Sequence, residues 1–224
     1  MTGVRRARVV VFDLDGTLLD SLPLVLAAIR HAIEPFGGRA TMDIFGHLGG
    51  PPERFMRTLI ADARHVPEAI SRMERYHHEN FQQIQPYAGV RPLLAALGRA
   101  GVPVAVWTGR DRSSTDRILQ VHRMADLFST VVCGDDLTSH KPDPAGLREI
   151  LRRLEVNPGD VCFVGDADVD VLGGFNCGVD TVLIRHARVV DSAIAACAWA
   201  TVATPADAYR LVLERTDVLP VDSI

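Results

Sequence analysis

Cysteine, positive charge and long apolar runs are all in short supply in this sequence. Only four of its 224 residues are cysteines, and none forms a CxxC pair. The sequence therefore indicates neither a zinc site nor a disulfide framework, and a reducing cytoplasm is the expected location. The 24 Lys and Arg residues against 28 Asp and Glu residues give a net charge of -4, which provides no general positive field for nucleic acid or an anionic membrane. We therefore expect neither of these as a partner.

The beginning of the chain imitates a signal peptide without completing one. A basic cluster at residues 5–8 precedes an apolar run, but Asp13 and Asp15 interrupt that run too early. No other stretch approaches the uninterrupted apolar length of a membrane helix. With 47% hydrophobic and 23% charged residues, the composition is that of a soluble globular protein. Its length fits one large domain, or one domain with a modest insert.

The stretch at residues 9–21 is the one around which the chain is organised. Residues 9–12 are β-branched or aromatic, and Asp13, Asp15 and Gly16 follow directly. This pattern is typical of a buried strand that delivers acids to a surface at its carboxyl end. Two close carboxylates repel each other unless a cation or a proton lies between them, which favours a hard metal such as Mg²⁺. A helix cap followed by a turn would explain Asp13 alone equally well.

From residue 86 onward, short apolar segments alternate with helical patterns. The alternation predicts βαβ crossovers and a doubly wound, mainly parallel α/β sheet that is covered by helices on both faces. Ligands of such sheets bind beyond the carboxyl ends of the strands, so further functional residues are expected directly after strands. The expected strands are residues 102–107, 130–133, 161–164 and 181–184, and the expected helices are residues 90–99, 113–122, 144–154, 168–177 and 205–214.

The segment before residue 86 has a helical pattern instead. Asp20 or Ser21 can cap a helix with Pro23 in its first turn. Further helices are expected near residues 52–63 and 67–83, with a loop at residues 46–52 and no convincing strand. We therefore predict an inserted α-helical cap domain at residues 21–86, within an α/β core domain made of residues 1–20 and 87–224.

Two of the later loops carry polar candidates at predicted strand ends. Thr108 and Gly109 follow the strand at residues 102–107, where a hydroxyl and a glycine N–H can hold a phosphoryl oxygen. Thr-Gly is also a common turn. Lys141 precedes a helix for which Asp143 is the expected cap and Pro144 the expected first residue. A lysine in that position is usually solvated, so the residue alone decides nothing.

The third such loop holds Asp166, Asp168 and Asp170, after the strand at residues 161–164. Three acids at the start of a helix could merely complement the helix dipole. Asp170 follows Asp166 by one helical turn on the same face, so both side chains could reach one cation. Asp168 points elsewhere and is expected to cap the helix.

Together, these segments resemble the four signature motifs of the haloacid dehalogenase superfamily, in the order that the family requires. They are Asp-Leu-Asp-Gly-Thr at residues 13–17, Thr108, Lys141 with the Pro-Asp-Pro that follows it, and Gly-Asp-x-x-x-Asp at residues 165–170. Gly109 stands where many small-molecule phosphatases of the superfamily have Asn, although other branches carry Thr-Gly-Arg. The resemblance implies a Mg²⁺-dependent phosphatase of the phosphoglycolate phosphatase-like branch, with a small helical cap and an aspartyl-phosphate intermediate.

The resemblance also implies a role for each motif residue. Asp13 is the expected nucleophile, Asp15 the general acid and base, and Lys141 the cation that steadies the nucleophile and the phosphoryl charge. Because dehalogenases of the superfamily lack the second acid, Asp15 favours phosphoryl transfer. The implied catalytic residues are Asp13, Asp15, Thr108 and Lys141; the implied phosphate-binding residues are Leu14, Gly16, Thr108, Gly109 and Lys141; and the implied Mg²⁺ ligands are Asp13, the Asp15 carbonyl, Asp166 and Asp170.

Two other functions stay open. A β-phosphoglucomutase-like phosphomutase shares the motifs and the cap, whereas a non-catalytic metal-binding regulatory protein is disfavoured by the intact motif residues. The expected substrate is a small phosphorylated metabolite, and the chain is expected to be a monomer or a homodimer. Contacts of Arg54, Arg57 or Arg110 with the substrate are left open by the sequence.

Overall fold

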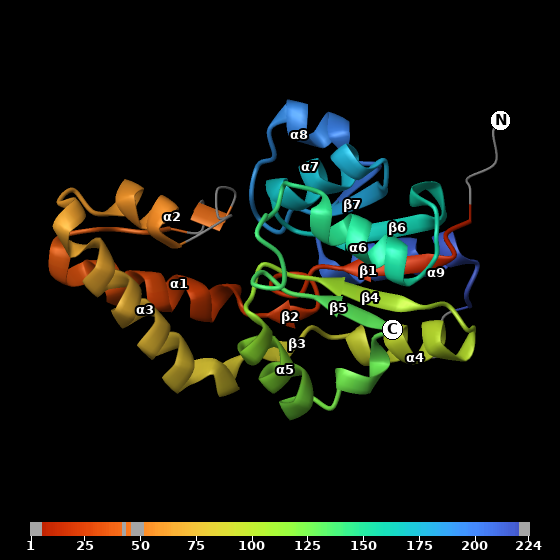
Figure 1. Ribbon diagram of the computed structural model, residues 1–224, viewed down its shortest axis with the longest axis horizontal. Helices are drawn as coiled ribbons and strands as arrows, with labels where there is room; N and C mark the ends of the chain where they lie inside the picture. Colours follow the sequence, from red (N-terminus) through yellow and green to blue (C-terminus); the bar gives the residue numbers. More distant parts are fainter. Residues whose placement is uncertain (1–5, 42–43, 46–51, 220–224) are drawn as a thin grey trace.

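The structure, a computed structural model, describes residues 6–41, 44–45 and 52–219. These residues form an α/β part around a parallel sheet and a helical part beside it (Figure 1). Within the described residues, no helix combines the length and the apolar character needed to cross a bilayer. The sheet consists of β1 (Val9–Phe12), β4 (Val104–Trp107), β5 (Thr130–Val132), β6 (Val161–Gly165), β7 (Asp180–Ile184) and β8 (Ala200–Val202).

The strand order of this sheet is β5-β4-β1-β6-β7-β8, and every pairing is parallel. The first strand in the sequence therefore lies in the middle of the sheet, because the chain winds outward from it in both directions. In the register, Phe12 lies opposite Val106 on one side and Val164 on the other. The loops that follow β1, β4 and β6 consequently start next to one another, and the predicted doubly wound α/β fold is confirmed.

Both faces of the sheet are buried, as the continuous apolar strands require. Val10 and Phe12 pack into one hydrophobic cluster with residues of α4, α5 and α9, while Val9 and Val11 pack into another with residues of α6. Period-two alternation along β1 thus supplies two cores at once. The helices of this part are α4 (Val90–Arg99), α5 (Arg112–Val121), α6 (Ala145–Arg153), α7 (Asp168–Cys177), α8 (Ser192–Cys197) and α9 (Pro205–Thr216).

The helical part has a hydrophobic cluster of its own, around the fully buried side chains of Ile29, Ile33 and Met56. Two short strands, β2 (Leu19–Asp20) and β3 (Gln85–Pro86), pair antiparallel and connect it to the sheet. The cluster therefore packs apart from the two that flank the sheet. The helices are α1 (Leu22–Ile33), α2 (Pro52–Leu59) and α3 (Val66–Asn80), with 3₁₀ turns at Glu34–Phe36, Ala63–His65 and Phe81–Gln83.

Several predicted element ends differ from the structure. Helix α5 is capped by Asp111, whose carboxylate accepts from Ser114 N at 2.9 Å, so the predicted cap at Ser113 is wrong. Helix α6 begins one residue later than predicted, because Pro144 is its cap and Asp143 accepts from the Ala145 amide.

Other elements were shortened or missed. Helix α2 ends at Leu59 instead of reaching residue 63, and α8, β2, β3 and β8 were not predicted. These missed elements are two to six residues long, which is too short for a periodic pattern to emerge. Of the predicted loop at residues 46–52, residues 46–51 lie outside the described residues, and Pro52 is the first residue of α2.

Candidate active site

Three adjacent strand ends bring polar residues of distant sequence together. Asp13 follows β1 and its N–H donates to Val164 O of β6 at 2.8 Å. Thr108 follows β4 and its N–H donates to Val132 O at 3.0 Å, and Asp166 follows β6. These main-chain hydrogen bonds continue the sheet for one more residue, so the side chains beyond it are held by rigid strands rather than by free loops.

Asp13, Asp166 and Asp170 form a compact acidic cluster. One carboxylate oxygen of each lies within 4.8 Å of the others, and all three residues are buried. Gly16 closes this cluster on one side: with a φ of +77°, a Cβ at this position would lie 2.2 Å from Asp166 Oδ2. A residue without a side chain is therefore required where the loop after β1 meets Asp166.

Lys141 lies inside the same cluster. Its Nζ donates to Asp13 Oδ1 at 2.6 Å and to Asp170 Oδ1 at 2.7 Å, and its side chain is buried. The lysine comes from the loop between β5 and α6, and Asp170 from the first turn of α7. The structure thus brings the residues of three predicted motifs into direct contact.

An aromatic surface supports the ammonium group of Lys141. Its Nζ lies 4.9 Å from the ring centroid of Trp107 and 5.5 Å from that of Phe163, distances at which the ring quadrupole attracts a cation. Two glycines make room for the Trp107 ring, since a Cβ at Gly146 or Gly173 would lie 2.2 Å or 2.7 Å from its atoms. Trp107 was not among the residues predicted from the sequence, although its position as the last residue of β4 was a usable signal.

Burial shapes the charges of the cluster. Desolvation, reinforced by the nearby Asp170, raises the pKa of Asp13 to about 7 in spite of Lys141. Desolvation and the charge of Asp13 also raise the pKa of Asp166 well above its ordinary value. The two carboxylates raise the pKa of Lys141 against the opposing effect of burial, so the lysine stays protonated.

When all three carboxyl groups are ionised, one lysine leaves the cluster with an excess of negative charge, and a divalent cation would remove that excess. Carboxylate oxygens are the donors that hard cations such as Mg²⁺ select. Asp13, Asp166 and Asp170 therefore fit a Mg²⁺ site, both in donor chemistry and in spacing.

Asp15 is separate from this cluster and forms an ion pair with Arg110. Arg110 Nε donates to Asp15 Oδ2 at 3.0 Å, and Arg110 Nη2 pairs with Asp15 Oδ1. Burial tends to raise the pKa of Asp15, but the charge and hydrogen bonds of Arg110 outweigh it, and the pKa lies below its ordinary value. Asp15 is therefore a carboxylate in this arrangement. The sequence left the role of Arg110 open, and the structure makes it the direct partner of Asp15.

The expected phosphate-binding groups lie around the same strand ends. Thr108 is buried, and its Oγ1 accepts from the Arg110 amide at 3.1 Å. The Gly16 amide donates to Leu19 O at 2.8 Å, so this N–H is already engaged. Neither the Leu14 amide nor the Gly109 amide has an acceptor among the described residues.

Asp168 does not cap α7 as predicted. The cap is Ala167, and its N–H donates to the Asp170 carboxylate at 3.0 Å. Asp168 pairs instead with Arg188, Nη1 to Oδ1 at 2.7 Å. The Asp170 carboxylate thus caps the start of α7. Asp168 instead holds Arg188 of the loop after β7.

The loop after β7 contributes residues that the sequence analysis missed. His186 Nε2 donates to Gly16 O at 2.8 Å, and Arg188 Nη2 donates to Asp166 O at 2.9 Å. These contacts tie the loop to both acid-bearing loops. The strand-end rule used for β1, β4 and β6 would have found them, because the strand at residues 181–184 was predicted.

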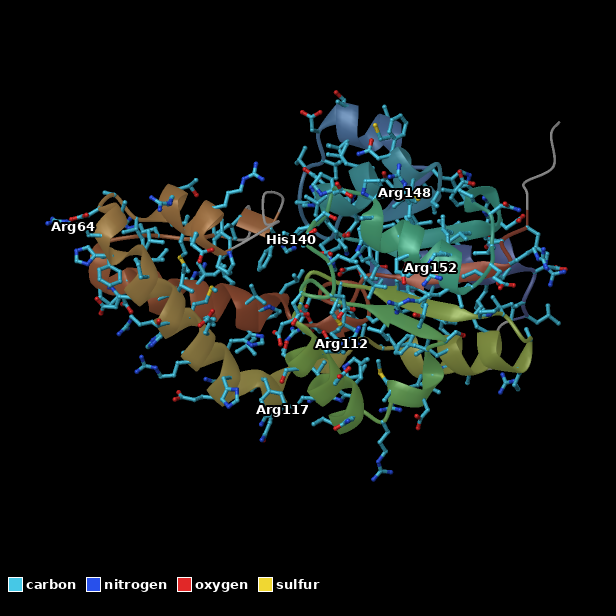
Figure 2. The ribbon with its side chains drawn as sticks, viewed as in Figure 1. Arg64, Arg112, Arg117, His140, Arg148 and Arg152 are labelled. Carbon is cyan, nitrogen blue, oxygen red and sulfur yellow. The ribbon has the colours of Figure 1, made fainter. Side chains whose placement is uncertain are left out.

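Three further polar residues make no described contact with the cluster. Arg54 and Arg57 are exposed on α2, and no contact of either with the cluster is among the described interactions. His140 is exposed at the edge of the α/β part that faces the helical part (Figure 2). These residues are therefore not part of the described constellation.

Comparison with known proteins identifies the family. Residues 10–184 match the family model of the haloacid dehalogenase-like hydrolases, so the chain belongs to this family. Curated relatives include the pyrophosphatase PpaX of Bacillus velezensis, 31% identical over 79% of this chain and 82% of that protein. The N-acetylmuramic acid 6-phosphate phosphatase of Pseudomonas aeruginosa is 31% identical over 82% and 84%. The phosphoglycolate phosphatase of Pseudomonas putida is 30% identical over 83% and 73%.

Solved structures share this fold. A protein named as a predicted phosphoglycolate phosphatase from Haemophilus somnus superimposes with a TM-score of 0.77 at 23% identity, covering 93% of this chain and 99% of that one. A Thermotoga maritima protein assigned by name to the β-phosphoglucomutases gives 0.69 at 26% identity, covering 92% and 98%. The resemblance drawn from the motifs, and with it the prediction of a hydrolase, is confirmed.

Proposed function

We propose that the protein is a Mg²⁺-dependent phosphatase that hydrolyses a small phosphorylated metabolite through an aspartyl phosphate on Asp13. The observation that carries the proposal is the buried Asp13, Asp166 and Asp170 cluster with Lys141 Nζ between two of its members. A lysine in this place lowers the cost of bringing a phosphate dianion to a carboxylate nucleophile. The phosphatase names of the three curated relatives support the same chemistry.

Asp13, Asp166, Asp170 and the Asp15 carbonyl would hold the Mg²⁺. When bound, the ion supplies positive charge that lets the phosphoryl group and the nucleophile approach each other. Lys141 holds Asp13 by one oxygen, Oδ1, which orients the carboxylate and leaves its other oxygen for attack on phosphorus.

Groups at the strand ends would bind the phosphoryl oxygens. The Thr108 hydroxyl and the amides of Leu14 and Gly109 are the proposed donors, because neither amide has a described acceptor. The Gly16 amide already donates to Leu19 O, so it is not a proposed donor to phosphate. The role of Gly16 is to let the backbone of its loop lie close to Asp166. Preorganised N–H and O–H donors of this kind stabilise charge as it develops.

Asp15 is the proposed general acid and base. It would protonate the departing oxygen, and then deprotonate the water that cleaves the acyl phosphate. Both of its oxygens face Arg110, so the acid step requires this pair to loosen once substrate is bound.

The helical part is the proposed cap domain, at residues 21–86, and residues 1–20 with 87–224 form the proposed core domain. Its separate hydrophobic cluster and its connection through β2 and β3 support this division. Closing such a cap over the site would exclude water from the phosphoryl intermediate. We further propose a cytoplasmic protein, monomeric or homodimeric, without nucleic acid or membrane partners.

A phosphomutase is the second candidate, favoured by the likeness to the Thermotoga maritima protein. It would return the phosphoryl group to a sugar instead of to water. Transient accumulation of a sugar bisphosphate with slow release of phosphate would favour this candidate over the phosphatase.

Hydrolysis of p-nitrophenyl phosphate with and without Mg²⁺ tests the proposal. Removal of the metal by a chelator should abolish turnover, and added Mg²⁺ should restore it. Asp13→Asn should lower kcat by about a thousandfold or more, because the nucleophile is lost. Asp15→Asn should slow release of the phosphoenzyme, which quenched-flow labelling would detect. Unchanged rates in both variants, or turnover that does not depend on metal, would contradict the proposed function.

A further inference from the structure

A pocket opens beside Asp166, at the junction of the helical part and the loop after β7. Its volume is about 400 Å³ including the portion open to solvent. It is lined by Leu22, Phe45, Asp166, Arg185, His186, Ala187 and Arg188.

The pocket shares one residue with the acidic cluster. Asp166 lines it and also belongs to the acidic cluster, so a ligand in the pocket adjoins the proposed phosphoryl site. Leu22 and Phe45 add apolar side chains to the lining.

Three of the lining residues are basic, but two of them are already committed to the structure. Arg188 pairs with Asp168 and donates to Asp166 O, while His186 Nε2 donates to Gly16 O. Both side chains therefore hold the loop to its neighbours and have few donors left for a ligand.

Arg185 differs from these two residues. Its side chain makes one described hydrogen bond, from Nη1 to His186 O at 3.2 Å, and no ion pair to a described carboxylate accompanies it. The residue is exposed, so its remaining guanidinium donors face solvent at the pocket. A guanidinium with two unengaged nitrogens is suited to a carboxylate or a phosphate, which it binds through a planar fork.

We infer that Arg185 binds a second anionic group on the leaving group, so that the preferred substrates are short phosphate esters or anhydrides that carry a carboxylate or a second phosphate. This inference rests on the proposed function and deepens it, since it names the class of substrate. The phosphoryl group lies at the acidic cluster with its metal and Lys141, and the second anion lies at Arg185. An ester with an uncharged leaving group leaves Arg185 without a partner.

Matched substrates test the inference. Phosphoglycolate and 2-hydroxyethyl phosphate have similar length, but only the first carries a carboxylate; pyrophosphate adds a second phosphate. The full-length protein with Mg²⁺ should show a kcat/KM for phosphoglycolate or pyrophosphate at least about tenfold above that for 2-hydroxyethyl phosphate. A gap of this size corresponds to one charge-assisted hydrogen-bonded contact.

Arg185→Ala should reduce this preference by about tenfold, through a higher KM for the anionic substrate, and Arg185→Lys should retain part of it. Arg152→Ala, which removes an exposed arginine of α6 on the α/β part (Figure 2), is the matched control and should leave the preference unchanged. A wild-type enzyme without preference for the second anion, or an Arg185→Ala variant that keeps the full preference, would overturn the inference.

The proposed function fails in a different way from the inference. If the function were wrong, the wild-type protein would not hydrolyse p-nitrophenyl phosphate with Mg²⁺. The second anion can then still be examined by calorimetry, with phosphoglycolate titrated into the wild-type protein and into Arg185→Ala. Equal affinity for the two proteins would overturn the inference without reference to turnover.

Discussion

Trp107 is a residue whose single ring contacts several groups of the site. Its indole lies below the ammonium of Lys141 and beside Phe163, whose ring centroid is 5.4 Å away. Gly146 and Gly173 both give way to it, so two helices are shaped around this one side chain. We regard Trp107 as a positioning residue, since it acts through Lys141.

Replacing Trp107 by Leu should lower kcat by about 3- to 30-fold, the range expected for loss of a desolvated cation–π contact. Trp107→Phe keeps an aromatic face and should retain most of the activity. The measurement is kcat and KM with p-nitrophenyl phosphate, together with the thermal midpoint of each variant. A merely structural role would lower the thermal midpoint of both variants and leave kcat of the folded fraction unchanged.

The residues of the site differ in how far the sequence could predict them. Asp13, Thr108, Lys141 and Asp166 were found because each follows a predicted strand or precedes a predicted helix. The pairing of Asp15 with Arg110 joins residues 95 positions apart, and no local pattern reports such a contact. The positive charge of Arg110 is compatible with binding either a substrate or an acidic side chain of the same protein, so the sequence does not distinguish the two.

Among the elements, α5 shows how a helix start fixes the edge of the site. Arg112, its first residue, pairs with Asp136 and donates to Val131 O at 2.9 Å, and its amide donates to Asp135 at 2.8 Å. Both acids lie in the loop after β5. They connect the loop after β5, which leads to Lys141, to the helix after β4.

This connection predicts a pH-dependent stability. The pKa of Asp136 lies below its ordinary value, because hydrogen bonds from Arg112 and from the Cys133 amide outweigh the effect of burial. A lowered carboxyl pKa stabilises the fold above the unfolded pKa of about 4, and this stability is lost as the pH falls through the folded pKa. Arg112→Ala should therefore lower the free energy of unfolding at pH 7 by about 1 kcal/mol, a small value because the pair is partly exposed.

Urea unfolding at pH 7 and at pH 3 measures the difference in free energy of unfolding between the wild-type protein and Arg112→Ala. This difference should be smaller at pH 3. Arg117→Ala is the control on the same helix. Arg117 lies 3.9 Å from the centroid of the Phe81 ring, and that contact does not titrate between these pH values. A pH-independent effect of Arg112→Ala would contradict the prediction.

The order of the longer elements followed from the sequence because the buried strands are mostly apolar and most of the helices carry one apolar face. The sequence did not predict the exact first residue of each helix. Asp111 and Ser113 are both good caps by residue type, and only the fold decides between them. The residues of strand β8 (Ala200–Val202) are partly exposed, so the sequence contains no buried apolar run that would predict a strand there.

At the scale of the whole molecule, the hydrophobic residues divide into clusters on either side of the site. One cluster fills the helical part and includes Met56, and two others flank the sheet. The site lies between these units, where Phe45 and Leu22 meet the loop after β7. The stability of the two parts should therefore be separable.

Met56→Ala should destabilise the helical part by about 2–5 kcal/mol, the cost of a cavity at a fully buried side chain. Both tryptophans, Trp107 and Trp199, lie in the α/β part, so their fluorescence reports its unfolding. In urea, circular dichroism should show early loss of helix while the fluorescence transition keeps its midpoint. Leu147→Ala, in a cluster of the sheet, should shift the fluorescence transition instead. If the circular dichroism and fluorescence midpoints of Met56→Ala shift together, the two parts unfold as one cooperative unit and the prediction is contradicted.

The paired strands β2 and β3 have a consequence for how such a molecule can be remodelled. Asp20 lies opposite Gln85 in their register, so the chain leaves the sheet and returns to it at neighbouring points. A tight turn could join these two positions and replace everything between them, because the sheet topology does not depend on the length of that excursion. The same attachment could receive the corresponding segment of a relative, and with it a different choice of substrate, while the acids, the lysine and the strands that carry them stay where they are.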